Sequence, residues 1–295
     1  MQVYWSCIRR IDMKKRNDAV RVTDIPIYNR IFPYLMKRRS EAMVFYTLNA
    51  DMTQAVSYIR SRNRAAKENK YHLFDFIMAA LTRTFALKPK LNRFISNCSH
   101  WQRNGISFTF VVKQEYSENG AERNAVVSFD PDMVFEEVAA IMRKTISSVR
   151  NDDEADEEKL LKTLFKLPKW MLLLFIRLLR CLESIGRYPK SLSAIDGLHA
   201  SAFVANLGSI NIPNPPYHHL YEWGTTSMFI TFGKLHRSKV ITEGGIEQII
   251  DSIAFGVTVD ERIAEGFYFM KAMKLFRFYL EHPHLLDVRP DLDQL

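Results

Sequence analysis

The segment FGVTVDERIAEGF, Phe255–Phe267, joins an apolar stretch to a charged turn and then to a second apolar stretch. Its first half favours a strand over about Ile249–Val259, and the residues after the turn favour a helix over about Glu265–Glu281. The turn reads DERIAEG, so it carries three acidic residues and one arginine but no histidine. The sequence therefore predicts a cluster of ionisable side chains at a strand-to-helix junction.

Strands and helices alternate along much of the chain. The helix predicted at His72–Leu87 is apolar around most of its circumference, as expected for a core helix packed on a sheet. The turn-rich segments SENGAE and TEGGIE favour hairpins, so at least part of the sheet is expected to be antiparallel. The other expected strands are Glu41–Ala50, Ile106–Gln114, Arg123–Phe129, Ala200–Ala205 and Ser227–Leu235, and the other expected helices run from about Asp51 to Glu68 and from Asp130 to Val149. This pattern predicts an α/β fold.

The composition is that of a folded protein, since 47% of the 295 residues are hydrophobic, enough for one large domain or two small ones. The 41 Lys and Arg residues only modestly outnumber the 33 Asp and Glu residues, so no nucleic-acid partner is expected. The three cysteines lie far apart without a CxxC pair, and no metal site or disulfide framework is expected. The N-terminus lacks a signal-peptide core, and no segment approaches about 18 uninterrupted apolar residues. We therefore expect a cytoplasmic protein.

Residues from about 150 to 195 interrupt the alternation and are interpreted as an insertion. The acidic run NDDEADEE, Asn151–Glu158, is typical of a solvated linker or a helix start. In the segment that follows, Phe165–Ser191, Pro168 suits the first turn of a helix and Gly186 its C-terminal end. On a helical wheel its polar side chains form a narrow stripe made of Lys166, Lys169, Arg177, Arg180, Ser184 and Arg187.

This amphipathic helix has three interpretations. It can be a core helix whose long basic side chains reach water. It can lie on an anionic membrane through Phe165–Ile185, because burial of apolar side chains and attraction to lipid headgroups both favour binding there. That position would place the protein at the inner face of the membrane. It can also fill a groove in a partner protein. The cations within it make spanning a bilayer costly.

Four blocks together resemble the catalytic domain of 2-oxoacid dehydrogenase acyltransferases and, more distantly, chloramphenicol acetyltransferase. The blocks are LKPKLNRFI at Leu87–Ile95, FVANLGS at Phe203–Ser209, MFITFGKLH at Met228–His236 and VDERIAEGF at Val259–Phe267. The resemblance covers roughly residues 40–283 without the insertion, and it is strongest to a stand-alone branch with DERIAEG in place of the family motif DHRxxDG. It implies a single CoA-dependent acyltransferase domain over 1–295, with a mixed sheet covered by helices.

The same resemblance implies partners and a co-substrate. The family uses a coenzyme A thioester and forms homotrimers in which each active site lies at a subunit boundary. Because the expected strand near Glu41 begins almost at once, no preceding lipoyl domain, and hence no lipoyl group, is expected on this chain.

Where the family has its catalytic histidine, this chain has Glu261, and where the family has its later aspartate, this chain has Glu265. An unperturbed glutamate is mostly ionised and a weak base, so Glu261 needs apolar surroundings to replace an imidazole. Where the family has a serine near the tetrahedral intermediate, this chain has Ala205, so Asn206 or backbone amides would supply the oxyanion donors. Asn206 can equally hold only a strand end.

His218 and His219, in PPYHHLYEWG, follow the ANLGS block by a short loop, and one of them can act as the base instead. The alternative is a turn in which they bond to the backbone. Two functions therefore compete. The first is acyl transfer from acyl-CoA to an unidentified, small or lipid-linked acceptor, and the second is non-catalytic binding of an acyl-CoA, a lipid or a partner protein.

Overall fold

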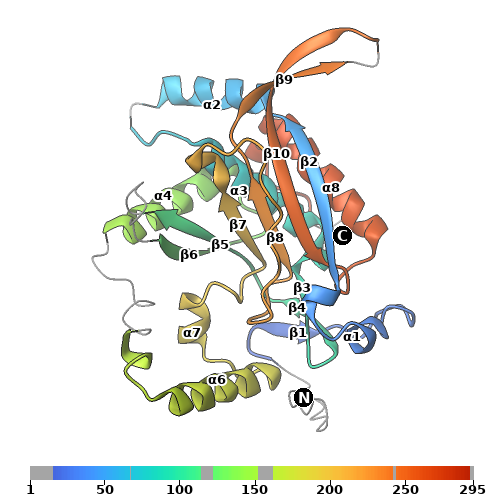
Figure 1. Ribbon diagram of the computed structural model, residues 1–295. Coiled ribbons are helices and arrows are strands. Elements are labelled where there is room, and N and C mark those ends of the chain that lie inside the picture. The colour runs from blue at the N-terminus through green and yellow to red at the C-terminus, as the bar shows by residue number, and fades with distance from the viewer. Residues whose placement is uncertain (1–15, 67, 114–121, 152–161, 242–243, 293–295) are drawn as a thin grey trace.

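The computed structural model describes residues 16–66, 68–113, 122–151, 162–241 and 244–292 (Figure 1). Its centre is a seven-stranded sheet, in which β9 pairs with β10 beside the main path. Along that path the order is β2 (Met43–Asp51), β10 (Glu247–Asp260), β8 (Met228–Phe232), β7 (Ala202–Asn206), β5 (Ile106–Lys113) and β6 (Glu122–Phe129), and β9 is His236–Ile241. Strands β5, β7 and β8 are mutually parallel and the other pairs are antiparallel, so the sheet is mixed.

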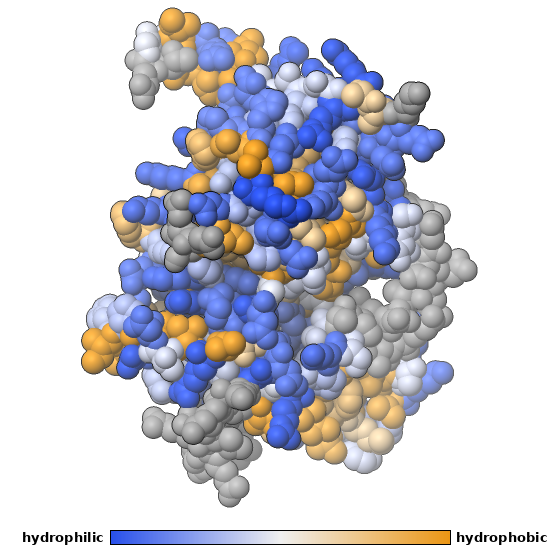
Figure 2. All heavy atoms as spheres, turned by 180° about the vertical axis from the view of Figure 1, so that it is seen from behind, coloured by the Kyte–Doolittle hydropathy of each residue, from blue (hydrophilic) through white to orange (hydrophobic). Residues whose placement is uncertain are grey.

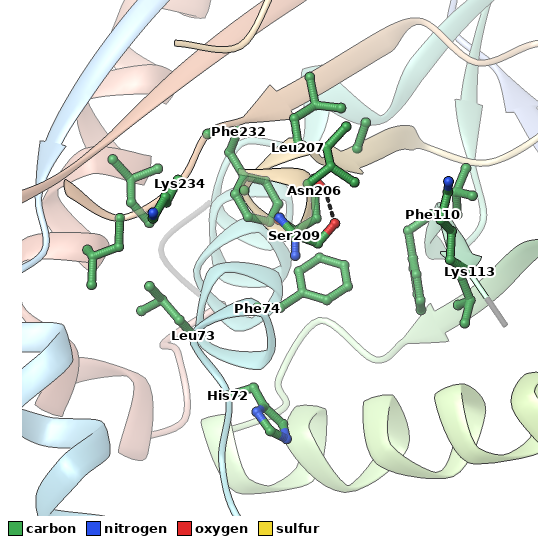
Figure 3. Close-up of a pocket in the computed structure, with 18 of the residues that line it drawn as sticks. His72, Leu73, Phe74, Phe110, Lys113, Asn206, Leu207, Ser209, Phe232 and Lys234 are labelled. Atoms are coloured by element: carbon green, nitrogen blue, oxygen red, sulfur yellow. Dashed lines mark hydrogen bonds between the residues drawn. The ribbon is translucent and has the colours of Figure 1, made fainter. Parts of the chain in front are cut away.

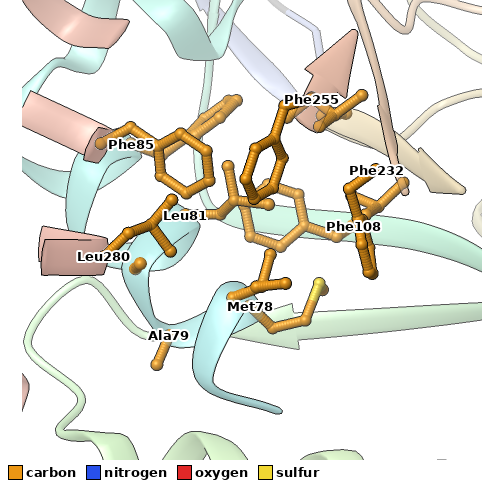
Figure 4. Packing of buried hydrophobic residues seen from close by; sticks show 14 of the residues in the cluster. Met78, Ala79, Leu81, Phe85, Phe108, Phe232, Phe255 and Leu280 are labelled. Carbon is orange, nitrogen blue, oxygen red and sulfur yellow. The ribbon is translucent and has the colours of Figure 1, made fainter. Parts of the chain in front are cut away.

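Four helices cover one face of this sheet (Figure 1): α2 (Thr53–Ala65), α3 (Leu73–Leu87), α4 (Phe135–Asn151) and α8 (Gly266–Glu281). As the sequence predicts, α3 is a core helix that is buried from Asp75 to Ala86. Figure 4 shows its Met78, Leu81 and Phe85 packed among aromatic side chains of β5, β8 and β10. This packing confirms the predicted α/β architecture of a mixed sheet covered by helices.

The predicted ends of several elements shift in the structure. The first turn after Asp130-Pro131 is not helical, and α4 begins only at Phe135, where the Val134 amide donates to the Glu137 carboxylate. The hairpin predicted at TEGGIE is confirmed, because β9 and β10 pair antiparallel with Ile241 opposite Glu247. The tip SENGAE lies largely outside the described residues, but the strands on either side of it, β5 and β6, also pair antiparallel. Where the sequence predicts one strand over Ser227–Leu235, β8 ends at Phe232 and β9 begins at His236.

A second, three-stranded sheet lies beside the first and was not predicted. Its order is β1 (Ala19–Arg21), β4 (Ser99–Arg103) and β3 (Arg93–Ser96). These strands are short, so their apolar alternation is weak, and they pack on a small cluster of Ala19, Phe94 and Trp101. The remaining short elements are α1 (Phe32–Leu35), η1 (Arg39–Glu41), η2 (Pro89–Asn92), η3 (Leu207–Ile210) and η4 (Pro283–Asp287).

The insertion forms α6 (Lys169–Ser184) and α7 (Lys190–Ile195), which lie at the lower end of Figure 1. Within α6 only Leu179 is buried, so the core-helix interpretation is wrong: most of the helix faces solvent. Beyond Asn151, the acidic run lies outside the described residues. None of the described helices combines the length and the apolarity needed to cross a bilayer.

Candidate functional site

A cavity lies at the carboxyl ends of the parallel strands β5, β7 and β8, and we call it the carboxyl-end cavity. Its volume is about 610 Å³. The N-terminus of α3 and the turn η3 close it, and Figure 3 shows the rings of Phe74, Phe110 and Phe232 inside it. Ligands commonly bind outside the carboxyl ends of parallel strands in α/β folds. This cavity is therefore the first candidate site.

The interior of the carboxyl-end cavity is apolar, whereas several of its outer residues are cationic. Lys113, Arg150 and Lys234 line it, and Figure 3 places the two lysines on opposite sides. Lys234 Nζ donates to Asn211 Oδ1 over 2.5 Å. A ligand with an apolar body and anionic groups matches this distribution of charge.

The N-terminus of α3 also lines the cavity, where the helix dipole favours anions and the Asp75 carboxylate offsets part of that effect. The His72 amide donates to the Asp75 carboxylate over 2.8 Å, which caps the helix. Burial raises the pKa of Asp75, and the His72 backbone and charges nearby counteract this. His72 is also a lining residue of the cavity, a position that the sequence interpretation did not give it.

Asn206 lies at the end of β7, where it caps η3. Its Oδ1 accepts from the Ser209 amide over 3.2 Å, and the Ser209 hydroxyl donates back to the Asn206 carbonyl over 2.7 Å (Figure 3). The local role that the sequence left open is thus present. No described residue accepts a hydrogen bond from its Nδ2, so the two N–H donors of that nitrogen remain for a ligand.

Glycine is needed where this turn meets the end of β8. A Cβ on Gly208 would lie 2.7 Å from the Gly233 carbonyl oxygen, and a Cβ on Gly233 would lie 2.1 Å from that of Pro213. Both distances are too short for carbon and oxygen in contact. The glycines of ANLGS and FGK therefore allow η3 and the β8 end to form one rim of the cavity.

The DERIAEG turn lies at the end of β10 and is held by a buried ion pair. Arg262 donates to both carboxylate oxygens of Asp260, from Nε over 2.8 Å and from Nη2 over 2.6 Å. Its Nη1 donates to the Met36 carbonyl, so the guanidinium points inward and is not paired with Glu261. The His100 Nε2 donates to the Arg262 carbonyl over 2.9 Å, and burial lowers the pKa of His100. The backbone of the turn is thus tightly positioned.

Glu261 and Glu265 both line a second cavity of about 350 Å³, which we call the turn cavity. Both residues are exposed. Asn29 Nδ2 donates to Glu265 Oε1 over 3.3 Å, while the Glu261 amide donates to the Ala42 carbonyl. The apolar walls come from α1 and the segment before it, β2, β10, the DERIAEG turn and α8, namely Tyr28, Phe32, Val44, Val259, Ala264 and Phe269. The structure therefore brings the two predicted acids together beside an apolar hollow.

His218 and His219 occupy a third place. His218 stacks on Phe229 with ring centroids 4.0 Å apart, and its Nδ1 donates to the His219 carbonyl over 2.7 Å. The His219 Nδ1 donates to the Leu220 carbonyl over 3.1 Å. Neither histidine lines the carboxyl-end cavity or the turn cavity. These contacts match the turn role that the sequence left as the alternative.

Within one chain, the predicted acids of the turn and the predicted oxyanion donor Asn206 do not meet. Asn206 of β7 lies opposite Phe232 of β8, and Phe232 lies opposite Phe255 of β10. Glu261 lies six residues beyond Phe255, which at about 3.3 Å per residue is about 20 Å along the sheet. One chain therefore places the candidate oxyanion donor and the candidate base at opposite ends of the sheet.

Sequence reasoning did not find the aromatic and cationic lining of the carboxyl-end cavity. Phe74, Phe110 and Phe232 have the pattern of ordinary core residues, and only their position at element ends shows that they line a hollow. Lys234 lies within the FGK block, and that block was the one available signal. Within the described ranges, no cluster of three or more His, Cys, Asp or Glu side chains is suited to a metal ion.

Comparison with known proteins gives a structural answer only. No protein-family profile and no curated protein matches this sequence. Among solved structures, a probable dihydrolipoamide acetyltransferase from Listeria monocytogenes matches with a TM-score of 0.57 and 13% identity over 88% of this chain and 95% of that chain.

Two further solved structures share the arrangement. Dihydrolipoamide acetyltransferase from Azotobacter vinelandii, studied for the catalytic roles of a serine, a histidine and an asparagine, matches with a TM-score of 0.58 and 13% identity over 90% of this chain and 93% of that chain. A chloramphenicol acetyltransferase matches with a TM-score of 0.52 and 14% identity over 86% and 94%. The expected resemblance is thus confirmed at the level of structure: this chain has the fold of the 2-oxoacid dehydrogenase acyltransferase catalytic cores and of chloramphenicol acetyltransferase.

Proposed function

We propose that the protein is a CoA-dependent acyltransferase that moves an acyl group from acyl-CoA to a small or lipid-linked acceptor. The carboxyl-end cavity carries the proposal, because it combines an aromatic interior, a cationic rim and a helix N-terminus within an acyltransferase fold. Acyl-CoA has matching chemistry: anionic phosphates at one end and an extended, largely apolar thioester arm at the other. The reaction would take place in the cytoplasm or at the inner face of the membrane.

The proposed assembly is a homotrimer. Because Asn206 and Glu261 of one chain lie about 20 Å apart along the sheet, a complete site requires the turn of one copy to approach the carboxyl-end cavity of another. Such an approach would also cover Glu261, which is exposed in the single chain, with apolar surface. The native mass is then expected to be about three times the 34.4 kDa of the chain. A strictly monomeric protein that still transferred acyl groups would contradict this assembly.

In the proposed reaction, Glu261 takes the proton of the acceptor hydroxyl, amine or thiol as that group attacks the thioester carbonyl. The Asn206 Nδ2 or backbone amides of η3 stabilise the oxyanion. Collapse of the intermediate breaks the carbon–sulfur bond, and the CoA sulfur recovers the proton. Glu265, which begins α8 and accepts from Asn29, would order the turn.

Acyl-CoA binding and turnover test the proposal separately. Replacing Arg150 and Lys234 by Glu reverses two cations of the carboxyl-end cavity, so the Kd for acyl-CoA measured by calorimetry should rise at least about tenfold. Replacing Lys271 and Lys274, two exposed cations of α8, by Glu is the matched control and should leave the Kd unchanged. Equal Kd values for both double variants would reject this binding site.

A binding protein without catalysis is the second candidate function. It is favoured by the exposure of Glu261 in the single chain and by the place of His218 and His219 outside both cavities. Chromatographic measurement of CoA release, with hydroxyl, amine and thiol acceptors, separates the two functions. Acyl-CoA binding without CoA release from any acceptor would favour the binding protein.

A further inference from the structure

The helix α6 has one apolar face against the protein and a second apolar face directed outward. The first face comprises the buried or half-buried Leu172, Phe175, Ile176, Leu179 and Leu182. On the outward face, Trp170 is 66% exposed, Leu174 60% and Leu178 53%. Figure 2 shows hydrophobic spheres gathered over α6 at the lower right of the molecule. In the part of the chain that the structure describes, only the first apolar face of α6 is covered by protein.

Contacts at the C-terminal end of α6 fix the orientation of the helix and hence of its outward face. Arg16 donates from Nη1 to the Glu183 carbonyl over 2.9 Å, and the Ser96 hydroxyl donates to the Glu183 carboxylate over 3.1 Å. The chain then turns at Gly186 with a φ of +67°, where a Cβ would lie 2.5 Å from Arg16 Cγ. Arg180 also lies over the Trp223 ring, 5.8 Å from its centroid. The second apolar face is therefore exposed although α6 is fixed against the rest of the protein.

Within residues 162–190, which include α6, the charge is almost entirely positive. Between residues 162 and 190 there are seven Lys or Arg residues and one acidic residue, Glu183, which is held by Arg16. On the helical wheel Lys169, Arg177 and Arg180 lie along one flank of the outward face, and all three are exposed. An apolar strip with a cationic flank is typical of a helix in the headgroup region of an anionic bilayer.

Two other occupants fit the charge less well. A second copy of this chain would bring an equally cationic surface against the first, with repulsion between the two flanks. A core position is excluded by the exposure of the face. The 16 residues of α6 extend about 24 Å, enough to lie along a membrane surface with the apolar strip in contact with lipid.

We infer that α6 docks this protein on an anionic membrane, with Trp170, Leu174 and Leu178 inserted and the basic flank on lipid phosphates. The docking end of α6 contacts Ser96 of β3, which lies in the same small sheet as His100, the residue that bonds to the DERIAEG turn. The membrane would therefore lie toward the turn end of the molecule rather than the carboxyl-end cavity. The inference does not depend on acyl transfer, because lipid binding is measured without any acyl substrate.

Co-sedimentation with vesicles tests it. The full chain should bind vesicles of phosphatidylglycerol and phosphatidylcholine more tightly than vesicles of phosphatidylcholine alone. Adding NaCl to roughly 0.5 M should weaken the binding, because salt screens the attraction between the basic side chains and the anionic lipids. Replacing Arg177 and Arg180 by Glu should lower the partition coefficient about 30-fold or more. The Lys271 and Lys274 double reversal is the matched control and should bind like the wild type.

A second pair of variants separates insertion from charge. Leu174 and Leu178 are both exposed, so replacing them by Gln should leave folding intact, which circular dichroism checks, and lower the partition coefficient about tenfold or more. The tryptophan emission maximum should shift to shorter wavelength when anionic vesicles are added, and replacing Trp170 by Phe should remove that shift. Binding that is unchanged in either double variant, or equal on neutral vesicles, overturns the inference. Loss of a higher oligomer in the leucine variant without any vesicle binding would assign α6 to a contact between copies instead.

Discussion

The DERIAEG turn and the carboxyl-end cavity are built in opposite ways. The turn is a short, continuous segment whose backbone is held by the buried ion pair of Asp260 and Arg262 and by the His100 bond. The cavity is assembled from the ends of β5, β7 and β8, the start of α3 and the turn η3, which are far apart in the sequence. Because of this difference, the turn can present reactive groups at fixed positions, whereas the cavity provides space and charge for a ligand.

The largest expected effect separates chemistry at the turn from binding at the cavity. Glu261→Gln keeps the shape of the side chain and removes the proton acceptor, so acyl transfer should fall by ~10²–10⁴ while the Kd for acyl-CoA stays the same. Steady-state kinetics and calorimetry measure the two quantities. Glu265→Gln, a neighbour in the turn cavity, is the control and should lower the rate much less.

The catalytic base would be reassigned if Glu261→Gln lowered the rate of acyl transfer only slightly while a His→Gln variant lowered it strongly. His218 and His219 test the loop, and His72 tests the histidine that lines the carboxyl-end cavity. With a histidine base, the rate should rise through the histidine titration range rather than the carboxyl range.

The second effect concerns the rigidity of the turn. Arg262→Ala would leave the Asp260 carboxylate buried without its partner, so the free energy of unfolding should fall by ~3–5 kcal/mol. Urea denaturation measures this loss. Arg277→Ala removes an exposed ion pair with Glu281 and should change the free energy by less than about 0.5 kcal/mol. Similar losses in the two variants would mean that the ion pair does not hold the turn.

The third effect asks whether Asn206 belongs to the cavity rim alone or also to the chemistry. Asn206→Ala removes the cap of η3 and should cost ~1 kcal/mol of stability. Asn206→Asp keeps an oxygen to accept from the Ser209 amide but lacks the Nδ2 donor. If that donor stabilises the oxyanion, the Asp variant should keep its stability and lose ~10²–10³ in kcat. Unchanged kcat in the Asp variant would leave Asn206 a structural cap.

The smallest effect is a pH dependence of the turn. Burial lowers the pKa of His100, so the unfolded chain binds a proton more readily than the folded one as the pH falls through about 6.5. The contribution of neutral His100 to the free energy of unfolding is complete above that pH. It is lost as the pH falls, by less than about 1.4 kcal/mol per pH unit.

His100→Gln can still donate to the Arg262 carbonyl but does not titrate. Its unfolding free energy, measured between pH 7.5 and 5.5, should therefore decline less than that of the wild type. An equal decline would assign the acid sensitivity to titratable groups other than His100.

The local structure of the main elements follows from patterns in the amino-acid sequence alone. Apolar periodicity placed β2, α3, β5 and β10 within a few residues of their observed ends, because those segments are long and their buried faces repeat regularly. The DERIAEG turn and the ANLGS block also identified the two places where ionisable and amide side chains lie next to cavities. Short strands such as β1 carry too few residues for a period to show.

The spatial relation between these two places depends on how the strands and helices pack together. The strand order puts Asn206 and Glu261 at opposite ends of one sheet, a separation that strand periods do not contain because they specify no neighbours. Packing also decided that α6 buries one apolar face and exposes the other, since a helical wheel shows which side chains share a face but not what covers them. The aromatic lining of the carboxyl-end cavity has the same origin: Phe74, Phe110 and Phe232 are ordinary core residues in the sequence, and their meeting at element ends makes a hollow.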